Sequence, residues 1–410
     1  MRAVHANGTD MMLCSTRQFG WLLAALLCAA APSLAQDMQE KDEPAARAAA
    51  VRHRGAIEAY LRARGAYEDE ASAYWQSVAD KRRGRNAKRR NNETIALDDY
   101  VLTQPPVYTG PPRPPGYIPP RRDPVQPVLP IPRIADFLKA AAAHYNFVPD
   151  RPKTDAEFKQ AYAKVATAAG LTRDQAVRIY AFETGGNGTY DGQAGIVGNR
   201  KDARPISPAM GYNQLLSTNT VSLLAEHGDK FVAALEKSAG ALSEADRKAM
   251  ERKIATLKKM IAFSRTVPNA WSEHDKLAKT TQGGMGIHAA VLDRDFGPLL
   301  QTQKLLDSVL FAKMKGYVQP LTAAELELMN FTGDGNGFDL VTMPQELREK
   351  IPTSNFFQRG GYERNPVASR NNTVAKLLDA TDSRMDREMQ GQGARDLAAA
   401  YDEVRPPSSE

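Results

Sequence analysis

The sequence of residues 171–188 is LTRDQAVRIYAFETGGNG, and it carries signals for both ends of a helix. Thr172 and Gln175 have the spacing of a capping box, in which each side chain accepts a hydrogen bond from the other residue's backbone N–H. The apolar positions of the predicted inner face are Ala176, Ile179, Tyr180 and Phe182. Gly185 is expected to end the helix, so its last turn contains Glu183.

Similar signals on both sides of this stretch predict a mainly α domain, because no run of alternating strands is present. The expected helices are one around 158–169 ended by Gly170, one from Ser217 to Gly228, one around 250–261, one from Phe296 to Met314 ended by Gly316, and one capped by Thr322 and Glu325 that ends before Gly333. The folded domain is therefore predicted to span residues 134–367.

The first 35 residues have the pattern of a signal peptide. Basic residues precede an apolar run at 21–34, and Ser33-Leu34-Ala35 offers the small residues that a signal peptidase requires. A buried core helix is the alternative for this run. Export predicts a periplasmic or secreted bacterial protein, and no later stretch is apolar enough for a transmembrane segment. Both cysteines, Cys14 and Cys28, fall inside the leader, so the mature chain is expected to lack disulfides.

Residues 36–100 are highly charged and are predicted to form a partly helical arm. Seven of the ten residues at 81–90 are basic. Such a run usually stays solvated unless it meets a polyanion, which suggests contact with an anionic wall or envelope surface. A nucleic-acid partner is disfavoured because the protein is expected to be exported.

Proline dominates the segment that follows. Twelve prolines lie within residues 105–132, a composition that favours extended polyproline II structure and cannot build a core. Residues 101–133 are therefore predicted to be a linker or a strap lying on the domain. Residues 368–410 are charged and are predicted to be a flexible C-terminal tail.

Glu183 is the strongest candidate for chemistry. The carbonyls at a helix C-terminus carry partial negative charge, and the apolar side chain of Phe182 lowers the local polarity. Both effects favour the neutral carboxyl, which can donate its proton to a leaving oxygen. The alternative is an ordinary surface glutamate at a helix end.

Three later segments favour the chemical interpretation of Glu183. They are Gly211-Tyr212-Asn213-Gln214-Leu215, which enters a helix, then Glu327-Leu328-Met329-Asn330-Phe331-Thr332-Gly333-Asp334-Gly335, and finally Pro352-Thr353-Ser354-Asn355-Phe356-Phe357. Together with Glu183-Thr184, they resemble the motifs of the lytic transglycosylase family, whose fold is similar to goose-type lysozyme. The resemblance covers about residues 155–365.

This resemblance implies a lysozyme-like helical domain with a helical insertion at 229–280. It makes Glu183 the catalytic residue, and the implied substrate-binding residues are Gly211, Tyr212, Gln214, Asn330, Tyr190 and Phe356. The sequence departs from the family pattern at Thr184, at the Tyr212-Asn213 pair, at Phe356 and in the length of the loop after Glu183.

The implied reaction is cleavage of the β-1,4 bond between N-acetylmuramic acid and N-acetylglucosamine in peptidoglycan, with one glutamate, no metal and no cofactor. Glu183 would protonate the glycosidic oxygen and then take a proton from the muramyl 6-hydroxyl as a 1,6-anhydro ring closes. A lysozyme-type hydrolase is the second choice. It needs a second carboxylate, for which Asp191 and Asp202 are candidates, although Asp191-Gly192 is also a common turn pair.

Metal signals are weak. Residues 334–339, DGNGFD, resemble a calcium loop, but Gln345 stands where a bidentate glutamate is needed, so a plain turn is favoured. His227, His274 and His288 show no ligand spacing.

Two other kinds of protein fit the same features. A lysozyme-like domain can hold glycan without cutting it, and the altered Thr184, Tyr212 and Asn213 favour such a module. A structural protein could instead use the basic arm and the proline-rich segment to dock on a wall assembly. An intact Glu183 favours the enzyme.

Overall fold

The structure, a computed structural model, describes residues 34–120, 130–196 and 203–404. All but the last two positions of the expected signal peptide lie outside these ranges, as does Asp202. The described residues form sixteen α-helices and three short 3-10 helices, with isolated β-bridges and no β-strand. The mainly α class predicted from the sequence is confirmed.

The α-helices of the described residues differ widely in length. In chain order they are α1 Leu34–Arg90, α2 Ile134–Tyr145, α3 Asp155–Ala169, α4 Arg173–Thr184, α5 Ser217–Ala239, α6 Glu244–Ser264, α7 Trp271–Thr280, α8 Gln282–His288, α9 Phe296–Met314, α10 Ala323–Thr332, α11 Asp334–Val341, α12 Gln345–Arg348, α13 Arg359–Glu363, α14 Pro366–Arg370, α15 Val374–Glu388 and α16 Gln392–Val404. The 3-10 helices are Leu97–Asp99, Ala289–Leu292 and Thr353–Phe356.

Contacts within the chain divide it into two units. The smaller contains residues up to Gly65 together with Thr109–Pro119, and the larger contains Ala66–Tyr108 and the chain from Pro120 onward. In the smaller unit the rings of Tyr60 and Tyr117 meet edge to face at 5.9 Å. Every candidate functional residue belongs to the larger unit.

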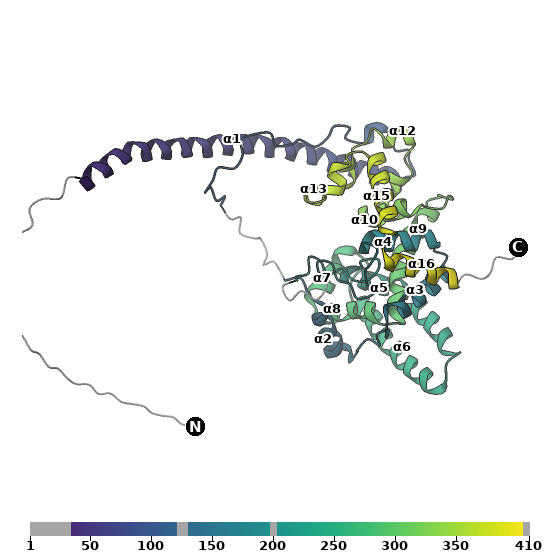
Figure 1. Cartoon of the computed structure of the whole chain (residues 1–410). Helices are drawn as coiled ribbons and strands as arrows, with labels where there is room; N and C mark the ends of the chain where they lie inside the picture. The colour runs from purple at the N-terminus through teal and green to yellow at the C-terminus, as the bar shows by residue number, and fades with distance from the viewer. Residues whose placement is uncertain (1–33, 121–129, 197–202, 405–410) are drawn as a thin grey trace, which may run out of the picture. The chain divides into compact units, whose positions relative to one another are not determined.

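Helices α9 and α10 organise the larger unit (Figure 1). Helix α9 packs against α3, α5 and α10, and α10 packs also against α4, α11 and α15. Leu300 and Leu305 of α9 and Leu326 of α10 are buried in the core that these helices share. The contact between α4 and α10, which are far apart in sequence, positions the candidate site.

The local signals predicted the ends of several helices correctly. Thr172 and Gln175 form the expected capping box of α4, and Thr322 and Glu325 form that of α10. Gly170 ends α3 in the left-handed conformation, with a φ of 90°. These signals succeed because both partners of each interaction lie within one helical turn.

The expectation that Gly228 ends a helix is wrong. Helix α5 continues to Ala239, and Gly228 faces α6. A Cβ at position 228 would lie 2.5 Å from Cγ1 of Ile261. The glycine therefore allows two helices of the predicted insertion to pack closely.

The expectation that residues 81–90 stay solvated is also wrong. They form the last turns of α1, and Arg85 has 0% of its surface exposed. The Arg85 guanidinium donates to the carbonyls of Asp99 and Asn355, at 2.9 and 3.0 Å, and forms an ion pair with Asp339. Arg82 donates to the carbonyl of Phe357 at 2.5 Å. Because Arg82 and Arg85 already bind groups of the protein, fewer basic side chains of the run are left to contact an external anionic surface.

The first four residues of the predicted linker, 101–104, bond to the helical domain. The backbone N–H of Val101 donates to Oδ1 of Asn355 at 2.9 Å, and the Tyr74 hydroxyl donates to the carbonyl of Thr103. The Gln104 side chain donates to the carbonyl of Asn372.

The C-terminal region differs from the predicted flexible tail. Residues 374–404 form α15 and α16, which pack against α4 and α3. The buried positions include Leu377, Met385, Leu397 and Tyr401. These apolar residues recur at helical spacing, so burying them stabilises both helices against the domain.

The predicted turn at 334–339 is the start of helix α11. Its Asp334 accepts a hydrogen bond from Ser308 Oγ at 2.6 Å, and Asp339 pairs with Arg89. These acidic side chains therefore have protein partners and do not converge as calcium ligands.

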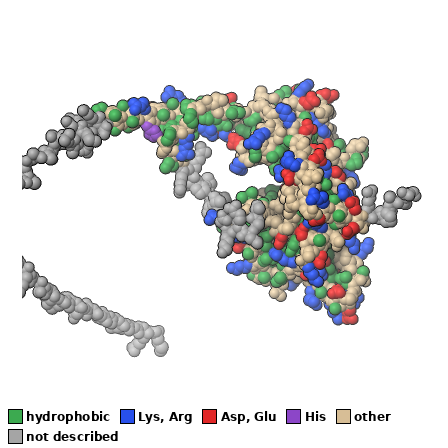
Figure 2. All heavy atoms as spheres, in the orientation of Figure 1, with side chains coloured by type: hydrophobic (Ala, Val, Ile, Leu, Met, Phe, Trp, Pro, Cys, Tyr) green, Lys and Arg blue, Asp and Glu red, His purple; other side chains and the backbone are tan. Residues whose placement is uncertain are grey.

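Basic and acidic side chains are interspersed over the face of the helical unit that Figure 2 presents. Among the described residues, none of the helices combines the length with the apolar composition that crossing a bilayer requires.

Candidate active site

The end of α4 brings Glu183 to a point where several helices meet. Gly185 caps the helix in the left-handed conformation, and its N–H donates to the carbonyl of Ala181. Gly186 follows with a φ of 73°, and a Cβ there would lie 2.1 Å from the carbonyl oxygen of Glu388 in α15. The Gly185-Gly186 pair therefore allows the chain to turn directly beneath α15, with the half-buried Glu183 beside it.

A second glutamate lies beside the first. Glu327 projects from α10 with 2% of its surface exposed, and its carboxyl is within hydrogen-bond reach of the Glu183 carboxyl. Among the described residues, Oε2 of Glu327 is buried and receives no hydrogen bond from another donor. Two carboxylates cannot donate to each other, so this contact is satisfied only when one of the two carries a proton.

Two cations flank this carboxyl pair, by which we mean Glu183 and Glu327. The Lys304 amino group of α9 donates to Oδ1 of Asn330, whose side chain also bonds Glu327. The Arg384 guanidinium of α15 lies 4.3 Å from the Phe182 ring centre and donates to the Phe182 carbonyl at 3.1 Å. Four helices thus contribute charged groups to one place.

Burial dominates the protonation of this group. It raises the pKa of Glu183, while the hydrogen bond with Glu327 and the charges of Lys304 and Arg384 oppose the shift. Burial, together with the negative charge of Glu183, raises the pKa of Glu327 well above the usual glutamate value. Burial also lowers the pKa of Lys304. These shifts favour keeping one proton in the carboxyl pair as the pH rises above the usual glutamate range.

The carboxyl pair borders open space. A cavity of about 250 Å³ is lined by both glutamates, Phe182, Phe331 and Arg384 among others. A larger cavity of about 550 Å³ is lined by Lys304, Asn330 and Trp271. Phe331 lines both cavities, with 51% of its surface exposed. The two cavities therefore adjoin at Phe331.

Of the substrate-binding residues predicted from the sequence, only Asn330 lines either of these two cavities. Gly211 packs against Gln301, where a Cβ would lie 2.0 Å from Nε2. Gln214, with a φ of 41°, donates to the Gly211 carbonyl at 2.8 Å and braces the turn before α5.

The predicted aromatic contacts are buried elsewhere. Tyr212 has 0% of its surface exposed, and its hydroxyl donates to Oδ1 of Asp155 at 3.0 Å. Tyr190 stacks on Phe158, with ring centres 5.2 Å apart. Phe356, with 2% exposed, packs against the Tyr100 ring at 6.0 Å. In this structure these aromatic rings support the core, which differs from the substrate-contact role predicted from the sequence.

The two departures at 212 and 213 have a packing explanation. The Asn213 side chain donates to the Tyr162 hydroxyl and to the Gln301 carbonyl, at 3.1 and 2.8 Å. The Tyr212 ring meets Tyr180 edge to face at 4.8 Å. Both residues therefore hold the turn before α5 and lie outside the two cavities.

Sequence reasoning assigned no role to Glu327, Lys304 or Arg384, although Glu327 begins the second of the three segments. Glu327 stands three residues before Asn330, on the same face of α10, so the motif that contains Asn330 could have indicated it. Lys304 is a cation in the middle of the largely apolar helix α9, which is a recognisable anomaly. Arg384 lies in the region predicted to be flexible.

Asp191, the described candidate for a second catalytic carboxylate, accepts a hydrogen bond from the Thr189 hydroxyl at 2.8 Å and pairs with Arg151. The Gly192 N–H bonds the Thr189 carbonyl, as in a tight turn. Asp191 lines neither of the two cavities at the carboxyl pair.

The chain matches no family model, no curated protein and no solved structure. The resemblance drawn from short motifs therefore stays a prediction, and the functional argument rests on the site itself.

Proposed function

We propose that this protein is a lytic transglycosylase that cleaves the β-1,4 bond between N-acetylmuramic acid and N-acetylglucosamine in bacterial peptidoglycan. Its lysozyme-like domain would act in the periplasm or outside the cell, after removal of the signal peptide. Glu183 is the catalytic acid and base, and Glu327 is its positioning partner.

One observation carries the proposal: Glu183 lies on a cavity wall in contact with a second, buried glutamate. A general acid must keep its proton at working pH. Burial raises the pKa of Glu183, and it raises the pKa of the adjoining Glu327 further, so the pair favours keeping a proton that the two groups can exchange. A mere surface glutamate would have neither the cavity nor the carboxyl neighbour.

The reaction follows from a single proton. Neutral Glu183 donates its proton to the glycosidic oxygen, and the bond from that oxygen to the anomeric carbon breaks. The Glu183 carboxylate then removes the proton of the muramyl 6-hydroxyl, whose oxygen bonds the anomeric carbon. Glu183 is neutral again at the end, and the nearby charges of Lys304 and Arg384 stabilise its intervening carboxylate.

The contact between the two glutamates disfavours an ordinary glycosidase mechanism. Retaining enzymes place their carboxyl groups about 5–5.5 Å apart and inverting enzymes about 6.5–9.5 Å apart, with the sugar between them. The Glu183 and Glu327 carboxyls lie within hydrogen-bond reach of each other, so no sugar ring fits between them. Glu327 is therefore suited to hold a proton and not to attack the anomeric carbon.

Aromatic surface supports glycan binding. Trp271 and Phe331 line the larger cavity and expose 54% and 51% of their surfaces. Rings of this kind stack on sugar faces, and Asn330 and Asn219 on the same wall offer hydrogen bonds to hydroxyl and acetamido groups. Trp271 starts α7, which belongs to the predicted insertion.

The test is digestion of purified peptidoglycan by the mature protein, with mass spectrometry of the released fragments. Anhydro-muropeptides from the wild type, lost in Glu183→Gln and kept in the exposed control Glu251→Gln, are expected. Reducing-end products would instead indicate a hydrolase. Equal sedimentation of wild type and Glu183→Gln with the wall, without released fragments, would leave a glycan-binding module.

A further inference from the structure

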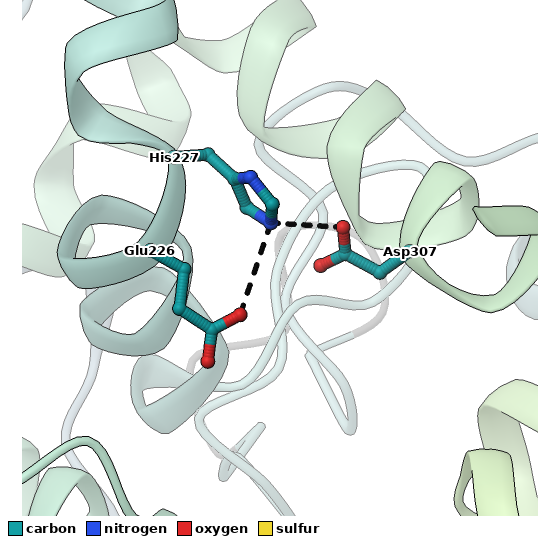
Figure 3. Close-up of side chains that lie close together, drawn as sticks. All are labelled: Glu226, His227 and Asp307. Carbon is teal, nitrogen blue, oxygen red and sulfur yellow. Dashed lines mark ion pairs between the residues drawn. The ribbon is translucent and has the colours of Figure 1, made fainter. Parts of the chain in front are cut away.

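Three side chains that could bind a metal converge beside the larger cavity (Figure 3). Glu226 and His227 are consecutive residues of α5, and Asp307 comes from the facing α9. Nε2 of His227 lies 2.9 Å from Oδ1 of Asp307 and 3.8 Å from Oε2 of Glu226. One atom from each residue lies within 4.8 Å of the others.

These separations match a coordination sphere. Zinc bonds to histidine nitrogen and carboxylate oxygen at about 2.0–2.2 Å, so neighbouring ligand atoms are roughly 2.9–3.4 Å apart in octahedral or tetrahedral geometry. The observed spacing is within about 0.5 Å of this range for both pairs that involve His227. The third pair of ligand atoms, on Glu226 and Asp307, lies within 4.8 Å.

The direction of the His227 ring favours a metal over a plain ion pair. Nε2 is shielded from solvent, yet it makes no directed hydrogen bond, although the Asp307 oxygen is only 2.9 Å away. The oxygen must therefore lie off the axis along which an N–H or a lone pair on this nitrogen points. In a metal site the ion lies on that axis, and the neighbouring ligand lies to its side.

A second histidine faces the same cavity. His274 has 1% of its surface exposed, its Nδ1 pairs with the Ser222 hydroxyl at 2.7 Å, and its buried Nε2 has no hydrogen-bond partner among the described residues. His274 and Glu226 both line the larger cavity. An unpartnered nitrogen buried against a cavity needs a ligand or water to satisfy it.

Asp307 also has the support that metal ligands usually have. Nε2 of Gln303 donates to Oδ1 of Asp307 at 2.6 Å, and the Lys230 amino group donates to Oε1 of Gln303 at 3.1 Å. Hydrogen bonds of this kind fix the orientation of a ligating carboxylate.

We propose that Glu226, His227 and Asp307 form a binding site for a divalent first-row transition-metal ion, with Zn²⁺ the preferred ion. An imidazole nitrogen among the ligands favours Zn²⁺ over Mg²⁺ or Ca²⁺, which prefer oxygen ligands alone. Three protein ligands leave at least one position for water or for a group of a ligand in the cavity. The proposal does not depend on the glycan-cleaving function.

The test is titration of the tag-free mature protein, stripped with a chelator, with Zn²⁺, Mn²⁺ and Ca²⁺ in a calorimeter. One Zn²⁺ per chain is expected, with weaker Mn²⁺ and much weaker Ca²⁺ binding. His227→Asn, Asp307→Asn and Glu226→Gln should each lower the Zn²⁺ affinity by more than about tenfold, since even changes to supporting residues cost about 10–100-fold.

The controls are His53→Asn, on the exposed part of α1, and Glu251→Gln on α6, which should bind Zn²⁺ as the wild type does. Circular dichroism checks that each variant is folded. Asp307→Asn and Glu226→Gln also keep the shape of the original side chains. Zn²⁺ affinity that stays within twofold in all three site variants, or the absence of saturable binding by the wild type, would overturn the proposal.

Discussion

Two buried clusters of charge in this protein follow opposite designs. Around Asp339, the guanidinium groups of Arg85 and Arg89 face a single carboxylate, so opposite charges are paired. At the end of α4, Glu183 and Glu327 are like groups in direct contact. In the first cluster the neighbours of the carboxylate carry the opposite charge, and in the second the neighbour is another carboxyl group.

The difference separates a structural cluster from a chemical one. The Arg85 side chain is fully buried, and its guanidinium donates to two backbone carbonyls and pairs with Asp339. The ion pair joins α1 to α11. The carboxyl pair borders a cavity and leaves an oxygen of Glu327 without a donor unless a proton is shared. Strongly shifted carboxyls beside a cavity are typical of active sites, whereas balanced ion pairs are typical of joints between elements.

The largest expected effect is on chemistry at the carboxyl pair. Glu183→Gln removes the proton donor and should lower the rate of peptidoglycan cleavage by about 10²–10⁴-fold, the usual contribution of a general acid. Its thermal unfolding should change little by comparison. Release of soluble muropeptides over time measures the rate, and a variant with wild-type activity would remove Glu183 from the mechanism.

The matching change at the structural cluster should affect folding. Arg85→Met leaves Asp339 with one cation fewer and removes the donor of the Asp99 carbonyl, so unfolding should be easier by about 3–5 kcal/mol. Arg83→Met, an exposed residue paired only with Asp80, should cost less than about 1 kcal/mol. Denaturant unfolding monitored by circular dichroism compares them. Equal costs would mean that the buried cluster is not a joint.

Replacing Glu327 should make the protein more stable at high pH. The pKa of Glu327 is raised in the folded state, so the fold favours its protonated form and this contribution is lost as pH rises from about 4.3 through the raised pKa. Glu327→Gln should therefore raise the unfolding free energy at pH 8 by about 1–3 kcal/mol, typical of a relieved buried polar group, and leave it unchanged at pH 4. A variant that loses stability at pH 8 would contradict the proton-sharing pair.

The smallest expected effect is on the shape of the pH–rate profile. Activity requires a proton in the carboxyl pair, so it falls as pH rises through the upper pKa of the pair. Glu327→Gln abolishes that upper step, because Glu183 then ionises alone beside Lys304 and Arg384. The alkaline limb should move to lower pH, while the rate at the acidic optimum stays within about tenfold. A variant with an unmoved alkaline limb would show that Glu327 has no part in holding the proton.

The sequence predicted features whose partners are close along the chain. The caps at Thr172 and Thr322, and the position of Glu183 at a helix end, depend on neighbours within a few residues. The burial of Arg85 depends on Asn355 and Asp339, more than 250 residues away, and nothing in the basic run itself indicates them. A run of cations therefore gave the wrong expectation of a solvated arm.

In the candidate site, too, the residues predicted from the sequence are those with local signals, and the residues missed depend on distant packing. Glu183 could be chosen from its own helix, and Asn330 from a short motif. The contact of Glu183 with Glu327 depends on the packing of α4 against α10, and Arg384 comes from a charged region whose helical periodicity is easily taken for a flexible tail. Tyr212 and Phe356 lie in the core because nearby aromatic rings surround them, which a linear motif does not reveal.

The most direct test of the shared proton is a pH titration of the glutamate carboxyl carbons by ¹³C NMR, on the wild type, Glu183→Gln and Glu327→Gln. In the wild type, one carboxyl proton should remain at neutral pH and leave only well above the usual glutamate range. That step should move to lower pH in both variants, because each keeps one buried carboxyl but loses the neighbouring carboxyl. A wild type in which every glutamate is ionised by about pH 5.5, a unit or so above the usual value, would contradict the account.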